Sequence, residues 1–145
     1  MAKDKISIEF KNDLSELDGL CKKLEDFGMS LGLSKKTLFH VNLVMEEVFT
    51  NIISYGFEDK TEHCIKITVS HENGTLELRA EDDGIPFNPT QIEAPDLCCP
   101  IEDRKVGGLG CYLTKRLMDH VEYQRLGNKN ILTLKISIRD SQDFE

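Results

Sequence analysis

Apolar residues recur every three or four positions in the stretch from Ser34 to Phe57. This spacing predicts one long amphipathic helix, because residues three and four apart share a helix face. Ser34 is a suitable N-cap, and Gly56 is a suitable residue just beyond the end. We expect Glu47 and Asn51, four residues apart, to lie one above the other beside the apolar stripe. That stripe consists of Val41, Val44, Met45, Val48, Ile52 and Tyr55.

Alternation of apolar and polar residues, which is typical of half-buried strands, recurs in the rest of the chain. It predicts strands at Lys5–Phe10, Cys64–His71, Leu76–Ala80, Val121–Leu126 and Ile131–Arg139. Asn73-Gly74 predicts a tight hairpin turn between the second and third strands, and residues 127–130 predict a turn between the last two. A capping arrangement at Asp13 and the helical spacing after it predict another helix that ends near Leu31.

The predicted order is strand, two helices, two strands, a long loop, a helix and two strands. Adjacent hairpins with helices between them favour an α+β two-layer sandwich, in which helices cover one face of a mixed, mainly antiparallel sheet. The 145 residues fit one domain, 1–145. Residues 90–106 have no clear period, and a loop of that length is often functional, for example as a lid over about 88–107.

Charge and composition exclude several classes of protein. The formal net charge of −8 argues against a nucleic-acid binder. No apolar run approaches the ~20 residues that span a bilayer, and the charged N-terminus lacks the apolar core of a signal peptide. Five cysteines without a C-x-x-C motif are typical of reduced thiols, and the four histidines show no zinc-ligand spacing with them. We therefore expect a cytoplasmic protein with no membrane contact.

Three short motifs bear on chemistry, and each is weak alone. Glu47-x-x-x-Asn51 lies on a predicted helix, Asp82-x-Gly84 at a strand end, and Gly108-x-Gly110 before a predicted helix. The glycine pair lacks the third glycine of a dinucleotide fingerprint, and the chain has no G-K-[ST] of a P-loop. Glycines before a helix still let a polyphosphate approach free amides at the positive end of the helix dipole.

Taken together and in this order, the three motifs resemble the N, G1 and G2 boxes of the GHKL ATPase superfamily, which has the histidine-kinase-like ATPase fold. The segments MEEVFTNIISYGF, DDGIPFNP and GGLGCYLTKRLMD are most similar to the small stand-alone bacterial anti-sigma-factor serine/threonine kinases. The resemblance implies ATP and Mg²⁺ as ligands. It also implies phosphorylation of a serine on a small antagonist (anti-anti-sigma) protein, binding of a sigma factor, and a homodimer of the kind that relatives often form.

The resemblance assigns roles to residues of the first two boxes. Asn51 would bind Mg²⁺ through its side-chain oxygen, and Mg²⁺ is held by few protein groups together with phosphates and water. Glu47 would be the general base or orienting group for the attacking serine hydroxyl. Asp82 would accept a hydrogen bond from the adenine amino group, and Gly84 would let the backbone pass close to the ring. Glu46 points about 100° away from Glu47 on the helix, toward the surface.

Further nucleotide contacts are implied in the second half of the chain. Gly108, Leu109 and Gly110 would give backbone amides to the phosphates. Arg104 and Lys105 would reach the γ-phosphate, or else form a solvated charge run. Thr133 matches a threonine often found near the adenine, although strand propensity also explains it.

Some positions depart from the family pattern, and other functions stay open. Tyr55 stands where many relatives have histidine, and Pro86 replaces a glycine common in histidine kinases. Cys98-Cys99 in the predicted lid matches no motif. The alternatives are a non-catalytic switch, in which nucleotide state only sets affinity for a protein partner, and a structural domain without nucleotide. The retained Glu47 disfavours the switch, since a pure binder needs no carboxylate there.

Overall fold

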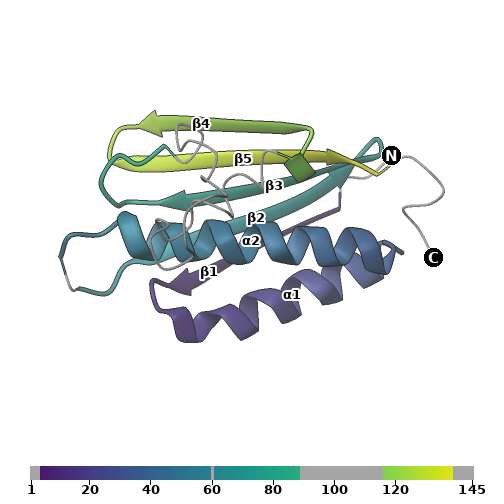
Figure 1. The fold of residues 1–145 in the computed structure, drawn as a ribbon, viewed down its shortest axis with the longest axis horizontal. Coiled ribbons are helices and arrows are strands. Elements are labelled where there is room, and N and C mark those ends of the chain that lie inside the picture. Colours follow the sequence, from purple (N-terminus) through teal and green to yellow (C-terminus); the bar gives the residue numbers. More distant parts are fainter. Residues whose placement is uncertain (1–3, 60, 89–115, 139–145) are drawn as a thin grey trace, which may run out of the picture.

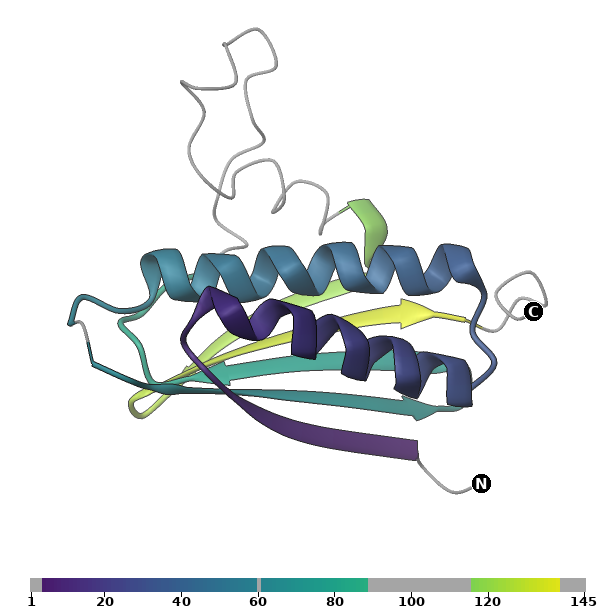
Figure 2. The ribbon, with the colours of Figure 1, turned by 90° about the horizontal axis from the view of Figure 1, so that it is seen from below.

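A computed structural model describes residues 4–59, 61–88 and 116–138. Five strands form one sheet in the order β1-β2-β3-β5-β4, and every pairing among them is antiparallel. Two long helices lie side by side on one face of this sheet (Figures 1 and 2). This confirms the α+β two-layer prediction; the described strands contain no parallel pair. The elements are β1 (Asp4–Lys11), η1 (Leu14–Glu16), α1 (Leu17–Ser30), α2 (Lys35–Tyr55), β2 (Cys64–Glu72), β3 (Thr75–Asp82), β4 (His120–Leu126) and β5 (Lys129–Ser137).

The long helix α2 begins and ends where the sequence predicts. The side chain of Ser34 accepts a hydrogen bond from the amide of Thr37 at 3.2 Å, which caps the first turn. The amide of Gly56 closes the last turn on the carbonyl of Ile52 at 2.8 Å. No helix in the described ranges is long and apolar enough to cross a membrane.

The core lies between the helices and the inner face of the sheet. Alternate residues of β2, β3 and β5 are buried under α2, whereas their neighbours point to the opposite face. Phe49 of α2 is fully buried and meets Phe10 of β1 edge to face, with ring centroids 5.9 Å apart. The buried positions Val69, Leu78 and Leu134 lie across three neighbouring strands in register.

The turn between β4 and β5 is shorter than predicted. It contains two residues, Gly127 and Asn128, because Leu126 already pairs with Lys129. Gly127 has φ +59°, a left-handed conformation that glycine adopts without strain. The predicted four-residue turn was therefore wrong at its end. The short turn places Asn130 inside β5, directly opposite Asp82 of β3.

Candidate functional site

The polar strip predicted on α2 is partly withdrawn from solvent. Asn51 is only 3% exposed, although it is an amide on a helix surface. Glu47 lies one turn earlier; its Oε1 is buried and has no hydrogen-bond partner within the described residues. Burial raises the pKa of Glu47, and the neighbouring Glu46 carboxylate raises it further. Helix α2 thus holds an amide oxygen and a carboxylate with one unpaired, buried oxygen on one face.

Glu46 has a different environment, although it is adjacent in sequence. Its side chain is exposed, as predicted, and its Oε1 accepts a hydrogen bond from the thiol of Cys21 in α1 at 3.3 Å. Burial raises the pKa of Cys21 to about 12, and the hydrogen bond to Glu46 adds to the shift. The thiol therefore stays protonated, and Glu46 serves as its partner at the helix–helix contact.

Asp82, the last residue of β3, is 4% exposed and points toward α2. Its Oδ1 accepts two hydrogen bonds, from the amide of Gly84 at 2.8 Å and from Nδ2 of Asn130 at 3.0 Å. Burial raises the pKa of Asp82, while these two hydrogen bonds oppose the shift. With Oδ1 occupied in this way, the carboxylate is held in one orientation.

Gly84 lies where the chain passes the end of α2. A Cβ atom built on Gly84 would lie 2.1 Å from the carbonyl oxygen of Gly56 and 2.9 Å from Oδ1 of Asp82. The next residue, Ile85, donates its amide to the same Gly56 carbonyl at 2.7 Å. Only glycine permits this close approach of two backbone segments. The structure thus gives Gly84 a role in holding the turn against α2.

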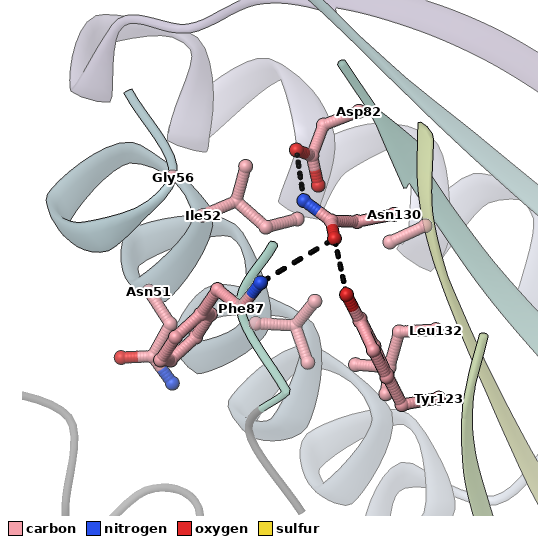
Figure 3. A pocket seen from close by; sticks show the side chains of 10 residues that line it. Asn51, Ile52, Gly56, Asp82, Phe87, Tyr123, Asn130 and Leu132 are labelled. Atoms are coloured by element: carbon pink, nitrogen blue, oxygen red, sulfur yellow. Dashed lines mark hydrogen bonds between the residues drawn. The ribbon is translucent and has the colours of Figure 1, made fainter. Parts of the chain in front are cut away.

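Asn130 connects Asp82 to the segment after it. Its Nδ2 donates to Oδ1 of Asp82 and, at 2.8 Å, to the carbonyl of Ile85. Its Oδ1 accepts from the hydroxyl of Tyr123 and from the amide of Phe87 at 3.4 Å (Figure 3). The same oxygen also accepts from Arg125 at 3.2 Å. Each polar atom of a 5% exposed side chain is thereby paired. Asn130 is a buried hub that fixes the turn after β3.

These side chains surround a small pocket between α2 and the strands β3, β4 and β5 (Figure 3). Apolar side chains form its walls, and Asn51, Asp82 and Asn130 supply polar groups. Apolar walls with a few fixed polar groups are typical of small-molecule sites. The lining residues are Val48, Asn51, Ile52, Gly56, Ala80, Asp82, Phe87, Tyr123, Asn130 and Leu132.

A family model described as the histidine kinase-like ATPase domain matches residues 10–136. The chain belongs to this family. Thus the polar strip of α2 and the Asp82 turn are parts of a histidine kinase-like ATPase domain, and the resemblance stated from the three motifs is confirmed.

Curated relatives of this ATPase domain carry kinase or anti-sigma names. A serine/threonine-protein kinase, BtrW, of Bordetella bronchiseptica is 30% identical over 77% of this chain and 78% of its own length. An anti-sigma F factor of Priestia megaterium is 24% identical over 84% of both chains. The serine-protein kinase RsbW of Listeria monocytogenes is 25% identical over 77% of this chain and 74% of its own.

Solved structures share the fold of this ATPase domain. The RsbU and RsbW domains of a Mycobacterium tuberculosis protein superpose with a TM-score of 0.67 at 9% identity, over 93% of this chain. This chain spans 32% of that longer one. The Acinetobacter baumannii histidine kinase AdeS superposes with a TM-score of 0.52 at 20% identity, over 92% of this chain. At these identities the likeness supports the fold alone.

The structure brings some of the predicted site residues of the ATPase domain together and leaves others apart. Asn51 and Asp82 line one pocket, with Gly84 just behind Asp82 and Glu47 one helical turn before Asn51. Thr133 does not join them. The predicted positions Gly108, Leu109, Gly110, Arg104 and Lys105 lie outside the described residues, as do Cys98-Cys99 and all of the predicted lid except Asn88.

Thr133, which the resemblance places near the adenine, does not line the pocket that the described residues form. In β5 it pairs with Arg79 of β3 and Glu122 of β4, which lie on the sheet face away from α2. Its neighbour Leu132 occupies the pocket position instead. The cause is the two-residue period of a strand, which sends adjacent side chains to opposite faces.

Four lining or supporting residues were not predicted: Phe87, Tyr123, Arg125 and Asn130. Arg125 donates to the carbonyl of Gly84 at 2.7 Å as well as to Asn130. Phe87 stacks on Tyr55 of α2, with centroids 5.2 Å apart and planes 26° from parallel. The signal available in the sequence was the spacing within the last hairpin. Tyr123 and Arg125 are two residues apart in a predicted strand and therefore lie on the same face.

Proposed function

We propose that this chain is an ATP-binding serine/threonine protein kinase of the anti-sigma-factor type, which transfers the γ-phosphate of ATP to a serine of a small antagonist protein. The observation that carries the proposal is the placement of Glu47 one turn before Asn51, beside the pocket that Asp82 closes. A carboxylate that lacks a partner for a buried oxygen costs stability, and such groups are concentrated at functional sites.

Asp82 is suited to recognise adenine. Its Oδ1 is occupied by the Gly84 amide and by Asn130, and within the described residues no hydrogen bond reaches Oδ2. That oxygen is the acceptor we assign to the adenine amino group. A purine that carries a carbonyl at this position would set acceptor against acceptor, which selects adenine over guanine.

Asn51 would hold the Mg²⁺ that accompanies ATP. The donor chemistry fits, because Mg²⁺ takes oxygen ligands and usually keeps only one or two from the protein. The Oδ1 atom of Asn51 is buried, which suits a ligand that faces the phosphates. No cluster of three or more His, Cys, Asp or Glu in the described residues forms a metal site of its own, consistent with binding through the nucleotide. When bound, Mg²⁺ supplies neutralisation of the phosphate charge.

Glu47 would act on the serine hydroxyl of the antagonist. Phosphoryl transfer depends mainly on positioning and charge neutralisation, and one carboxylate suffices to orient the nucleophile and take its proton. The raised pKa of Glu47 makes its carboxylate a better proton acceptor than an exposed glutamate. Asn51 would thus hold the nucleotide through Mg²⁺, and Glu47 would act on the serine hydroxyl.

The partners we propose are a sigma factor and its anti-anti-sigma antagonist. The support is that an anti-sigma F factor and a serine-protein kinase RsbW align with this chain over most of both chains. In such a system, phosphorylation of the antagonist would decide whether this chain holds the sigma factor or the antagonist.

The test is phosphotransfer from γ-labelled ATP to candidate antagonists encoded by neighbouring genes, together with calorimetry of Mg·ATP binding. We expect label on one antagonist, loss of that label with Glu47→Ala, and unchanged ATP affinity in this variant. Heat of binding without a labelled partner would favour the non-catalytic switch. Neither heat nor a change in melting temperature would overturn nucleotide binding itself.

A further inference from the structure

A histidine lies between two carboxylates just outside the pocket. Nε2 of His63 is 2.8 Å from Oδ1 of Asp59, in the loop after α2, and Nδ1 is 3.0 Å from Oδ1 of Asp83, in the turn after β3. Asp83 is the residue between Asp82 and Gly84. The ring therefore spans the two segments that bound the proposed nucleotide site on this side.

We propose that His63 is a positioning residue for the turn Asp82–Gly84, and that its doubly protonated ring ties this turn to the end of α2. A neutral imidazole has one N–H and a second nitrogen that only accepts, so it donates to one of the two aspartates at most. An imidazolium donates to both. The tie, which consists of the hydrogen bonds from the His63 ring to Asp59 and Asp83, is thus complete only in the charged form. Nucleotide affinity therefore depends on pH through this residue.

The ring is held in place before it makes either contact. The amide of His63 donates to Oδ1 of Asn12 at 2.8 Å, and its carbonyl accepts from the amide of Asn12 at 3.0 Å. The ring stacks on Phe57, with centroids 4.5 Å apart and planes 20° from parallel. Its side chain is 19% exposed. Because the rotamer is already restricted, the two hydrogen bonds cost little further entropy.

The charges around the ring favour the imidazolium. Asp59 and Asp83 face it from opposite sides, and Lys11 at the end of β1 is paired with Glu62 at 3.6 Å. The hydrogen bond to Asp59 is the largest cause that raises the pKa of His63, and Asp83 adds to it, against a smaller opposing effect of burial. The stabilisation is therefore complete below the ordinary pKa of about 6.5 and is lost as the pH rises through the higher folded pKa.

Thr61 provides the alternative partner of the neutral ring. Its hydroxyl lies 2.9 Å from both Oδ1 of Asp59 and Nε2 of His63. It donates to Asp59 when the ring is charged, and it can donate to Nε2 once that proton is lost. Deprotonation at Nε2 then breaks the hydrogen bond to Asp59, which loosens the link between the loop after α2 and the turn.

The tie acts where two parts of the proposed site meet. The amide of Ile85 already joins the carbonyl of Gly56 at 2.7 Å, so His63 makes a second link between the same two segments. Helix α2 carries Asn51 and Glu47, and the turn carries Asp82. A change at His63 therefore shifts the proposed metal and hydroxyl groups relative to the proposed adenine acceptor.

The consequence for binding rests on the proposed function, whereas the tie itself can be tested without nucleotide. In ¹⁵N and ¹³C NMR titrations of the free protein, we expect a His63 pKa above 6.5 that falls in Asp83→Asn and in Asp59→Asn. A pKa that neither substitution moves would overturn the tie. Asp83→Asn is a mild change, because Asp83 is exposed and its side chain hydrogen-bonds only to His63 among the described side chains.

The nucleotide experiment compares Mg·ATP affinity at pH 6 and pH 8.5 in wild type, His63→Gln and His120→Gln. His120 is an exposed control that faces Glu122 at the far end of β4. The ionisation of ATP itself affects all three proteins alike. The ratio of the dissociation constants at the two pH values, compared between the proteins, therefore isolates the contribution of His63. We expect wild type and His120→Gln to lose about threefold more affinity between pH 6 and pH 8.5 than His63→Gln, because only these two proteins lose the imidazolium of His63 as the pH rises.

Identical pH profiles in wild type and His63→Gln would overturn the positioning role, even if the NMR titration shows the tie. No binding by wild type at either pH would instead overturn the proposed function. In that case the His63 pKa values in the free protein still decide whether the tie exists.

Discussion

The two polar regions of the pocket differ in how far their hydrogen bonds are satisfied. Around Asn130, five hydrogen bonds join β3, β4, β5 and the segment after β3. On α2, a buried oxygen of Glu47 has no such partner among the described residues. A saturated buried network is rigid and preorganised, whereas an unsatisfied carboxylate costs stability. The difference teaches that one region is held in shape by its own hydrogen bonds, whereas the other contains the unsatisfied carboxylate to which we assign a role on the incoming serine hydroxyl.

The strongest test of this contrast is Glu47→Gln. We expect phosphotransfer to fall about 100- to 10,000-fold, the usual contribution of a general base. The free energy of unfolding at pH 7 should not fall and should rise slightly, because the pKa of Glu47 is raised and the fold therefore disfavours its charged form. This gain should vanish below the ordinary pKa of 4.5, where both states are protonated.

Glu46→Gln is the matched control, since Glu46 is exposed and bonded only to the Cys21 thiol among the described residues. It should keep transfer close to wild type. Equal losses of phosphotransfer in the two variants would contradict a specific role of Glu47 in the transfer. The measurements are initial rates with labelled ATP and denaturant unfolding from pH 3 to pH 7.

The next largest effect is expected from Gly84→Ala. The added methyl group would lie 2.1 Å from a backbone carbonyl, which cannot move aside as a flexible side chain can. We expect a loss of about 1–3 kcal/mol or more in the free energy of unfolding, typical of overpacking, together with weaker ATP binding. Gly19→Ala is the control, because nothing lies within 4 Å of its new Cβ and alanine favours a helix. If both variants unfold at the same denaturant concentration, the close approach at Gly84 has no energetic weight.

Asn130→Ala tests the saturated region directly. It leaves Asp82, Tyr123 and Arg125 each without one partner, and a buried polar group left unpaired costs about 1–3 kcal/mol. ATP affinity should fall as well, because Asp82 loses the contact that orients it. Asn128→Ala, in the exposed turn two residues earlier, should change stability by less than about 0.5 kcal/mol. A stable Asn130→Ala protein with normal affinity would show that the hub is dispensable.

The smallest effect is expected from Phe87→Leu. This change removes the stack on Tyr55 but keeps the Phe87 amide that reaches Asn130. Aromatic pairs contribute about 0.5–1.5 kcal/mol beyond the area they bury, so we expect the free energy of unfolding to fall by about that amount and the melting temperature to fall with it. Phe39→Leu, at a side chain that is 64% exposed, is the control and should change the melting temperature little. A larger fall in melting temperature in Phe39→Leu than in Phe87→Leu would contradict a stabilising role of the stack between Phe87 and Tyr55.

The fold was predictable because its signals are local. The spacing of α2, its Ser34 cap and the Asn73-Gly74 turn each depend on residues a few positions apart, and the structure confirms them. Asn73 and Gly74 both have positive φ, as the predicted hairpin turn requires. The 3₁₀ turn at Leu14–Glu16 was missed, where the Asp13 cap begins a short helix separate from α1.

The hub in the site was not predictable, because it depends on register between strands far apart in sequence. Asn130 lies in a stretch that suits a turn equally well, and only pairing with β3 places it opposite Asp82. Thr133 illustrates the same dependence on the strand, since the alternation of Leu132 and Leu134 already implied that Thr133 faces away from the pocket. A motif therefore identifies a residue type, while the register decides which neighbour reaches the pocket.

The pairing of β3 with β5 has a consequence for how the protein folds. The β2–β3 and β4–β5 hairpins are local, but the hydrogen bond from Asn130 to Asp82 closes a separation of 48 residues. Closing a long loop costs entropy before the contacts repay it, so we expect this pairing to form late. The pocket then does not exist in the folding transition state. A bound nucleotide should accordingly slow unfolding while leaving the rate of folding almost unchanged.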